Sequence, residues 1–524
     1  MNILFKIKEI VPKSLYLKFV FLFILTIFGI FLELIGIGLV LPIITIVVTG
    51  NYDLDIGFGI DKIVNLLNLN SSETFVTPLL ILLVVYAIKG IYLFFLGCFN
   101  ARFCYLLNTR LSEQIYKNYL DQDYLFHVKT NSSEMIRIII SEINFFIKSV
   151  IMPLLLVIME IFVFIGITIL LFSVDPKNTI YIVLIFFVLG VFYFLLINKK
   201  LAKWGKEKVY HEGLKLKNLT QGLNGIKIVK MFNREKVFLN TFNLNSYRST
   251  KVVENATILS QIPRIAIEFI AVFLIIFFII FNVESSSNLS EQFPILALFA
   301  AAAFRLMPSV NRLFNNLQTL RYAAPSVNLI YSQYPLKNKE YNDNNNLSKF
   351  DFSKNINISN LNFNYPETKA EVLRNINFEI KFGESVGIIG ETGSGKTTLI
   401  DIICGLVDAE SGKILVDGVD IRSNIRSWQK NIGYVPQNVY LLDDTIRANI
   451  IFGKKKDEKS EENLINSIKY SQLDKLISNL PDELETIVGE MGARLSGGQV
   501  QRIGIARALY NNAKLLIFDE STSA

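Results

Sequence analysis

The sequence predicts two domains in series: an α-helical membrane domain of six spans, followed by an α/β domain built around a glycine-rich loop. The first reason is composition, because 51% of the 524 residues are hydrophobic and the mean hydropathy is +0.39, well above the balance of a soluble protein. The second is that long apolar runs fill residues 1–335. The third is that residues 351–524 alternate short strand-like and helix-like segments.

Six apolar runs in residues 1–335 are long enough to cross a bilayer, whose hydrocarbon core needs about 20 apolar helical residues. The expected spans are Phe19–Val48, Phe75–Leu96, Val150–Val174, Ile180–Ile197, Ala256–Phe281 and Phe293–Leu313. Because the number of spans is even, both ends of this domain lie on the same side of the membrane.

The charges of the loops identify that side as cytoplasmic. The segment Lys199–Lys251 contains 13 Lys and Arg residues, whereas Asn51–Thr74 contains four acids and one lysine. Short basic loops stay on the cytoplasmic side of a membrane. We therefore assign the formal net charge of +7 to these loops, and expect contact with membrane lipids and no nucleic-acid partner.

The loops Arg102–Lys148 and Asn198–Val252 keep helical periodicity and contain few helix breakers. We expect them to continue the spans as helices whose tips, near Leu120–His127 and Gln221–Val229, contact the following domain; charged linkers are the alternative. On the other side of the membrane, Ile60–Leu67 has the spacing of an amphipathic helix that lies on the external surface, and an ordinary loop is the alternative.

Charged residues inside the spans each cost about 2.5 to 3.5 kcal/mol on insertion scales. They are the acids Glu33, Glu160 and Glu268 and the bases Lys89, Arg264, Arg305 and Arg312. One interpretation is that they form ion pairs, as Arg264 and Glu268 would at one helical turn apart. The other is that the bases, which outnumber the acids, face a central cavity and bind a phosphate-bearing substrate.

The composition changes at residues 336–350, where Asn, Asp, Lys and Ser indicate a solvated linker, and the α/β domain covers residues 351–524. Its expected strands are Ile356–Phe363, Val372–Ile380, Ser385–Ile389, Lys413–Val416, Ile432–Val435 and Leu515–Phe518. This pattern predicts an α/β nucleotide-binding core with antiparallel strands beside it.

The loop Gly390–Thr398 (GETGSGKTT) follows the expected strand Ser385–Ile389 and precedes the helix-like run Leu399–Ile403. In that setting backbone N–H groups surround nucleotide phosphates, Lys396 reaches the β- and γ-phosphates, and the Thr397 hydroxyl ligates Mg²⁺. The expected binding residues are Gly390, Glu391, Thr392, Gly393, Ser394, Gly395, Lys396, Thr397 and Thr398.

Four single residues add to this prediction. Tyr365 can stack on an adenine ring, although an aromatic residue alone is more often part of the core. Gln437 follows the strand Ile432–Val435 and can sense Mg²⁺ and water. Asp519 and Glu520 follow the last expected strand, where Asp519 suits Mg²⁺ and Glu520 can polarise a water.

The segment Leu495–Gln499 (LSGGQ) precedes the expected helix Val500–Tyr510. A serine and two glycines at a helix N-terminus suit an anion. The residues concerned are Ser496, Gly497, Gly498 and Gln499.

Taken in order, GETGSGKTT, LSGGQ and LLIFDE resemble the motifs of the ATP-binding cassette (ABC) superfamily, and six spans before one cassette resemble an exporter half-transporter. The resemblance implies ATP and Mg²⁺ as ligands, Tyr365 as the adenine-stacking residue, and Gln437 as the link between cassette and membrane domain. It implies that Asp519 binds Mg²⁺ and that Glu520 is the general base.

A single cassette of this family lacks half of each ATP site. The resemblance implies that Ser496 and Gly498 contact the γ-phosphate bound by another protomer. A homodimer in the bacterial cytoplasmic membrane, with the cassette in the cytoplasm, is therefore expected.

The chain departs from the family pattern at its end, Ser521–Ala524. It stops before the usual Leu-Asp pair, the switch histidine and the last strands, and His127 and His211 both lie in the membrane domain. We expect either a fragment of a longer gene product, with the cassette truncated at its C-terminus, or a chain that hydrolyses ATP poorly.

Three segments of the membrane domain are similar to the bacterial lipid-linked oligosaccharide flippases of the PglK type. They are Leu32–Pro42, Ile262–Ile265 and Phe304–Arg312. The leading hypothesis is an ATP-driven flippase for a pyrophosphate-linked glycolipid, with Lys89, Arg264, Arg305 and Arg312 as substrate contacts. A multidrug or lipid A exporter is the alternative in the same class, and a membrane-anchored ATP-binding protein that does not transport is the alternative in another.

Overall fold

The computed structural model describes residues 3–39, 76–174, 176–283, 289–334, 350–366, 371–453 and 458–520. The chain forms two compact units, Met1–Gln122 with Lys129–Asn338, and Asp123–Val128 with Lys339–Ala524. The external helix expected at Ile60–Leu67, all but the last residue of the expected linker, and residues 521–524 lie outside the described residues.

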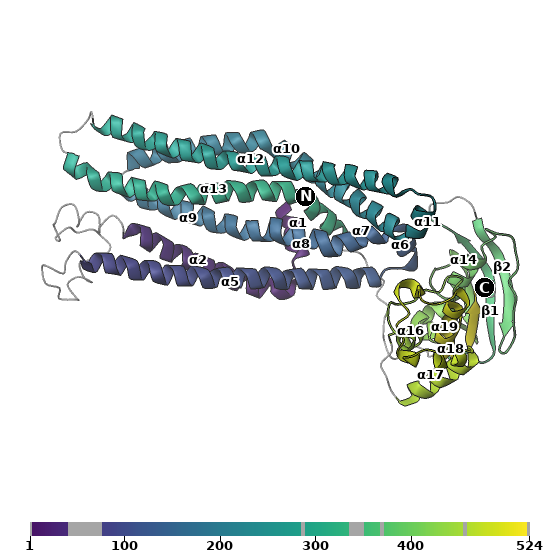
Figure 1. The fold of residues 1–524 in the computed structure, drawn as a ribbon. Coiled ribbons are helices and arrows are strands. Elements are labelled where there is room, and N and C mark those ends of the chain that lie inside the picture. The colour runs from purple at the N-terminus through teal and green to yellow at the C-terminus, as the bar shows by residue number, and fades with distance from the viewer. Residues whose placement is uncertain are drawn as a thin grey trace. The chain divides into compact units, whose positions relative to one another are not determined.

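The first unit is a bundle of long helices (Figure 1). Its elements are α1 (Ile3–Ile10), η1 (Lys13–Leu15), α2 (Tyr16–Gly38), α5 (Val76–Leu120), α7 (Ser132–Arg137), the π-helical turn η2 (Ile138–Glu142), α8 (Ile143–Phe146), the π-helical turn η3 (Ile147–Ile151), α9 (Met152–Val174), α10 (Pro176–Asn224), α11 (Ile226–Met231), α12 (Glu235–Val283) and α13 (Leu289–Gln333). A short helix, α6 (Tyr124–Lys129), follows α5.

The helices run well past the expected spans. The helix α5 continues beyond Leu96 to Leu120, and α10 continues beyond Ile197 to Asn224. Neither extension contains a proline, the residue that most strongly ends a helix. The predicted helical continuation of the spans is therefore confirmed.

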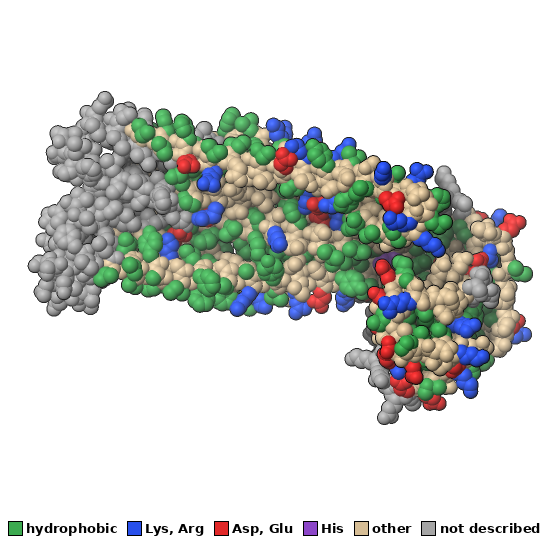
Figure 2. Space-filling model, viewed as in Figure 1, with side chains coloured by type: hydrophobic (Ala, Val, Ile, Leu, Met, Phe, Trp, Pro, Cys, Tyr) green, Lys and Arg blue, Asp and Glu red, His purple; other side chains and the backbone are tan. Residues whose placement is uncertain are grey.

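Three helical segments of the described part are long and apolar enough to cross a membrane: Lys13–Gly36, Leu82–Leu120 and Ser132–Ser173. The number of six spans remains a prediction. Large apolar side chains point outward from these segments, including Leu17 (85% exposed) and Phe94 (68% exposed). The face in Figure 2 shows such side chains spread over the helices, as expected of a surface that contacts lipid.

Close helix packing gives the first unit its interior. Val163, Ile167 and Leu171 recur every four residues and form a buried face of α9, which packs along α13. Where α10 crosses α13, a Cβ on Gly205 would lie 2.0 Å from the carbonyl oxygen of Tyr322. Only glycine permits this approach, so Gly205 fixes where the two helices cross.

The second unit contains two sheets and a set of short helices (Figure 1). The antiparallel sheet has the order β2-β1-β3-β4, and β5 pairs with β6 in parallel. The strands are β1 (Asn355–Asn364), β2 (Glu371–Lys381), β3 (Ser411–Val416), β4 (Val419–Asp420), β5 (Ile432–Val435) and β6 (Leu515–Phe518). The helices are α14 (Lys396–Ile403), η4 (Ile421–Ser423), α15 (Ile425–Gln429), α16 (Ile446–Ile451), α17 (Glu458–Tyr470), α18 (Asp474–Ser478), η5 (Glu483–Glu485), η6 (Glu490–Gly492) and α19 (Gly497–Tyr510).

Two hydrophobic cores stabilise this unit. One surrounds the fully buried Trp428 and joins the antiparallel sheet to α14. The other joins α16, α17 and α19 through Ile446, Leu464 and Ile503. The glycine-rich loop leads into α14, which packs in the first core, and the LSGGQ segment begins α19, which packs in the second. Different cores therefore support the two motifs.

The prediction of a strand at Ser385–Ile389 is wrong, because these residues form no strand. Ile389 is 97% exposed and Val386 is 45% exposed. A strand exists only when a neighbour completes its hydrogen bonds, and no described strand pairs with this segment. The other five expected strands are confirmed to within two residues at each end.

Candidate functional site

The loop Gly390–Thr398 has the backbone geometry of a phosphate-binding loop. Gly393 and Gly395 adopt positive φ angles of 85° and 89°, a conformation that L side chains rarely take. Gly395 caps the N-terminus of α14, and a Cβ on it would lie 3.0 Å from the carbonyl oxygen of Val372. The open N–H groups of the first turn of α14 therefore meet the loop, as binding of phosphate requires.

The Lys396 ammonium lies against this loop. Its Nζ donates to the carbonyl oxygens of Gly390 at 2.8 Å and Glu391 at 3.0 Å. The side chains from Glu391 to Ser394 are exposed. Thr397 is also exposed, whereas Thr398 is buried with its hydroxyl 3.1 Å from that of Tyr365. The loop thus presents its N–H groups, one ammonium and the Thr397 hydroxyl outward, which is the donor set that a nucleotide phosphate with Mg²⁺ needs.

The ends of the parallel strands β5 and β6 bring three predicted residues together. Val435 pairs with Phe518, so the residues that follow both strands emerge at the same edge. There Gln437 Nε2 donates to Glu520 Oε2 at 2.7 Å, and the Asp519 N–H donates to the Val435 carbonyl at 3.0 Å. Glu520 has a φ of 47°, a strained conformation of the kind found at functional sites.

A buried carboxyl group that the sequence did not indicate lies beside this edge. Asp401, on α14, is only 9% exposed. Burial and the nearby charge of Asp519 raise the pKa of Asp401 to about 6. Burial also raises the pKa of the Tyr434 hydroxyl, which donates to Asp519 Oδ2 at 3.4 Å. Asp519 therefore lies beside a buried carboxyl group and a tyrosine hydroxyl.

Replacing Asp401 by Asn is expected to stabilise the cassette at neutral pH. The folded cassette binds the Asp401 proton more tightly than the unfolded chain, so this group's contribution to stability falls as the pH rises between about 4 and 6. Thermal unfolding of parent and variant at about pH 5 and about pH 7.5 tests this. The variant's gain in melting temperature should be larger at the higher pH. An equal gain at both values would show that Asp401 does not titrate in this range.

The LSGGQ segment forms the start of α19. Ser496 caps this helix: its hydroxyl accepts from the Gln499 N–H at 3.4 Å, and the Ser496 N–H donates to Gln499 Oε1 at 2.8 Å. A Cβ on Gly497 or Gly498 would meet no atom within 4 Å. These glycines thus present open backbone to solvent, where an anion can approach.

Two predicted groups of residues stay apart within one chain. No hydrogen bond in the described part of the chain joins Ser496–Gln499 to Gly390–Thr398. Tyr365 is partly buried, with its ring 5.0 Å from that of Phe363 and packed against the first core. Its predicted stacking on adenine stays a prediction.

In the helical unit, two of the four predicted substrate cations pair with acids. Lys89 Nζ lies 3.5 Å from Glu33 Oε1, and both residues are buried. Arg312 Nε donates to Glu160 Oε1 at 2.5 Å, and the Ser309 hydroxyl donates to the other oxygen of Glu160. The ion-pair interpretation therefore holds for these two bases, although 46% of the Arg312 side chain remains exposed.

The other two cations differ from these. Arg264, on α12, is exposed, and its guanidinium has neither an ion pair nor a hydrogen bond among the described residues. The expected pair of Arg264 with Glu268 does not form among those residues either. Arg305 lies in α13, and its side chain is outside the described ones. Arg264 is the predicted cation best placed to meet a ligand.

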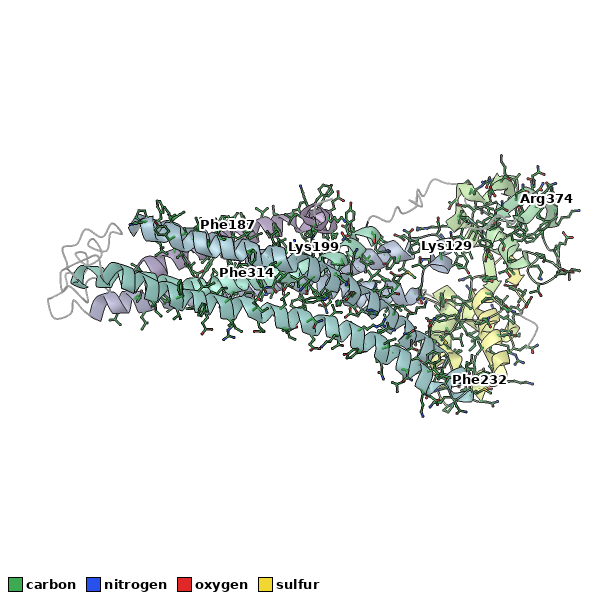
Figure 3. The ribbon with its side chains drawn as sticks, turned by 90° about the horizontal axis from the view of Figure 1, so that it is seen from above. Lys129, Phe187, Lys199, Phe232, Phe314 and Arg374 are labelled. Atoms are coloured by element: carbon green, nitrogen blue, oxygen red, sulfur yellow. The ribbon has the colours of Figure 1, made fainter. Side chains whose placement is uncertain are left out.

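An apolar cavity of about 440 Å³ lies beside the Glu160 pair. Its walls come from α9, α10 and α13 and include Phe187, Val191 and Phe314 (Figure 3). Glu160 and Ser309 also line it. The cavity thus has a hydrocarbon lining and adjoins the ion pair of Glu160 with the exposed Arg312.

The family model described as ABC transporter matches residues 373–523, and that described as ABC transporter transmembrane region matches residues 18–307. An ATP-dependent lipid A-core flippase of Francisella tularensis subsp. tularensis (strain FSC 198) is 30% identical over 439 residues, which cover 82% of this chain and 70% of the relative. The protein of the same name from Syntrophus aciditrophicus is 30% identical over 455 residues, which cover 85% of this chain and 74% of the relative.

Among solved structures, a bacterial Atm1-family ABC exporter with ATP bound has a similar fold. It matches 98% of this chain and 87% of its own with a TM-score of 0.78. Its sequence identity is 20%, so this likeness concerns the fold alone.

Proposed function

Because the chain belongs to the ABC transporter family, as an ATP-hydrolysing exporter with a fused membrane domain and cassette, we propose that it flips a phosphate-bearing glycolipid. The movement is from the cytoplasmic to the outer leaflet of a bacterial cytoplasmic membrane. The leading substrate is a lipid-linked oligosaccharide with a pyrophosphate link.

The observation that carries this proposal is the apolar cavity beside the Glu160 pair. A glycolipid of this class combines a hydrocarbon chain with a phosphate. The cavity has a hydrocarbon wall, and Glu160 in its lining pairs with the partly exposed Arg312, which lies just outside that lining. Attraction between arginine and phosphate is stronger in a membrane interior than in water. The exposed Arg264 adds a second cation, and Arg305 and Lys89 are proposed as further contacts.

The cassette residues supply the energy of transport in this proposal. Lys396 and the loop N–H groups bind the phosphates of ATP, Tyr365 stacks on adenine, and Glu520 accepts the proton of the attacking water while Gln437 orients it. Mg²⁺, held by Thr397, Gln437 and Asp519, would neutralise phosphate charge.

A homodimer completes each ATP site in this proposal. The open backbone at Gly497 and Gly498 faces solvent and has no described partner in its own chain. A second protomer that presents its phosphate-binding loop to this segment would fill that role. We propose that the cassettes lie in the cytoplasm.

A second candidate substrate is lipid A, because the two flippase relatives carry that name. Lipid A and a lipid-linked glycan share phosphate groups and hydrocarbon chains, so the same site features suit both. Proteoliposomes separate them. We expect a polyprenyl-pyrophosphate glycan to stimulate ATP hydrolysis and to be flipped; activity with lipid A alone would favour the second candidate. ATP hydrolysis without flipping of either lipid would support a protein that binds ATP and does not transport.

Replacing Arg264 by Ala is expected to lower glycolipid flipping about tenfold, the effect of losing one charge-assisted contact, while basal ATP hydrolysis remains. Arg264 is the sharpest test of the cationic site because its removal leaves no described carboxylate without a partner. Flipping is measured by the loss of glycolipid from the outer face of proteoliposomes.

The matched control is Arg110→Ala, since Arg110 is an exposed arginine in the cytoplasmic part of α5. It should flip at the parental rate. Unchanged flipping by Arg264→Ala would remove Arg264 from the substrate site, and unchanged flipping by the triple variant with Arg305→Ala and Arg312→Ala would point to an uncharged substrate.

A further inference from the structure

A second large cavity, of about 620 Å³, lies in the cytoplasmic part of the helical unit. Three helices of one chain, α7, α10 and α13, form its walls. The motifs of the cassette and the charged residues of the spans take no part in it. The cavity is therefore distinct from the proposed ATP and substrate sites.

The deepest polar group of this cavity is Arg137, whose side chain is 7% exposed. Its Nη1 donates to Glu142 Oε1 at 2.6 Å, and the Ser326 hydroxyl donates to Glu142 Oε2 at 2.5 Å. Glu142 follows Arg137 at the fifth position along the chain, and the π-helical turn η2, which ends at Glu142, places both on the same face. Such turns often occur at functional sites.

One donor of this arginine has no partner. Arg137 Nε makes no hydrogen bond within the described residues, although a buried N–H group is nearly always paired. Gly213 on α10 faces the guanidinium, and a Cβ there would lie 3.6 Å from Nε. Nε is covered by the atoms around it, so a ligand in the cavity meets Arg137 through the rest of its guanidinium, and a methyl group on Gly213 would narrow the cavity at that point.

The remaining lining suits an amphiphilic anion. Lys206 and Lys217 are exposed on α10 and line the cavity with Arg137, against the single acid Glu134, whose Oε1 lies 3.9 Å from Arg137 Nη2. Apolar walls separate these cations, including Leu214 on α10 and Leu329 on α13. A ligand with one anionic group and an apolar body matches both parts.

The depth of the cavity favours a soluble ligand. If the expected span ends at Ile197, Lys206 lies about 13 Å and Lys217 about 30 Å further along the helix, at 1.5 Å per residue. The polar layer of a bilayer extends only about 5 to 8 Å beyond the hydrocarbon on each side. The headgroups of membrane lipids therefore end above the cavity.

We propose that the cavity between α7, α10 and α13 binds a soluble amphiphilic anion, with a phosphate or carboxylate group beside Arg137 and Lys217 and an apolar body against Leu214 and Leu329. Lys206 lines the other end of the cavity and adds to its positive charge. This site is separate from the transported substrate and from ATP. It stands whether or not the chain flips a glycolipid.

The test uses the full chain in phosphatidylcholine nanodiscs, with the cassettes saturated by a non-hydrolysable ATP analogue. The probe is 1-naphthyl phosphate, titrated by calorimetry, with 1-naphthol as the uncharged comparison. A second arm titrates dihexanoyl phosphatidylglycerol against dihexanoyl phosphatidylcholine, which distinguishes a lipid headgroup from a soluble phosphate.

Gly213→Ala is the sharpest variant, because it narrows the cavity beside the Arg137 guanidinium, keeps every charge and favours the helix. We expect it to raise the Kd for naphthyl phosphate about tenfold, the effect of one lost charge-assisted hydrogen bond. The double variant Lys206→Ala with Lys217→Ala should raise it at least as much. Lys203→Ala is the matched control, since Lys203 is exposed on the same helix and does not line the cavity.

Equal affinities of the parent, Gly213→Ala and the double variant would overturn the proposal, as would the absence of binding in both arms. Phosphatidylglycerol that binds in place of naphthyl phosphate, and is weakened by Gly213→Ala, would keep the anion site and assign it to a lipid.

Discussion

Replacing Glu520 by Gln is expected to leave ATP binding intact and to lower ATP turnover by about 10² to 10⁴, the usual contribution of a general base. The amide keeps the size of the side chain and can still meet Gln437, whose Nε2 lies 2.7 Å from Glu520 Oε2. What it loses is the ability to accept a proton from the attacking water. Lys396 and the loop N–H groups, which we propose bind the phosphates, remain.

The measurement pairs nucleotide binding with phosphate release by the purified protein in detergent or nanodiscs. Lys396→Ala is the contrasting variant, because it removes the ammonium at the loop and should weaken nucleotide binding itself. A Glu520→Gln protein that hydrolyses ATP at the parental rate would show that another group is the base. Loss of binding by the same variant would instead assign Glu520 to the phosphate site.

The cassette motifs could be predicted because each depends on residues close in sequence. The strand boundaries Ile432–Val435 and Leu515–Phe518 agree with β5 and β6, since short β-branched and apolar runs between turns indicate buried strands. Parallel pairing of β5 with β6 then brings Gln437 to Glu520. That contact required the fold, because nothing in the sequence specifies which strands are neighbours.

The charges of the helical unit could be located but not paired from the sequence. Burial costs show that Glu33 and Lys89 need partners, yet a pattern along one helix does not tell which helix lies beside it. The contact of α2 with α5 makes the Lys89 pair, and that of α9 with α13 makes the Arg312 pair. The sequence shows that bases outnumber acids in the spans. It does not show which of these bases remain exposed after pairing.

Arg137 and Glu142 could not have been predicted as a pair at all. In an α-helix, residues five apart point to different faces, and ion pairs are sought at three or four. The π-helical turn η2 changes that spacing locally. The run at Ser385–Ile389 shows the opposite situation. Its sequence has the pattern of a strand, but no described strand lies beside it to complete the hydrogen bonds.

Breaking the Arg137–Glu142 pair is expected to cost about 3 to 5 kcal/mol of stability, because removing one partner leaves a buried charge uncompensated. Glu142 is fully buried and Arg137 is 6% exposed, so water replaces the lost partner poorly. Glu142→Leu also leaves the Ser326 hydroxyl without its acceptor. Thermal unfolding of the purified chain in detergent should show a markedly lower midpoint.

The double variant Arg137→Met with Glu142→Leu separates the charge from the packing. Exchange of a whole buried ion pair for apolar residues of similar volume is often neutral or stabilising, so the double variant should unfold at a higher temperature than Glu142→Leu alone. The exposed pair of Arg110 and Glu113, at 3.2 Å, is the control, and Glu113→Gln should shift stability by less than about 1 kcal/mol. A Glu142→Leu protein as stable as Glu113→Gln would mean that water or a second cation-binding group reaches Arg137, and that the cavity beside it is wetter than the burial of this pair implies.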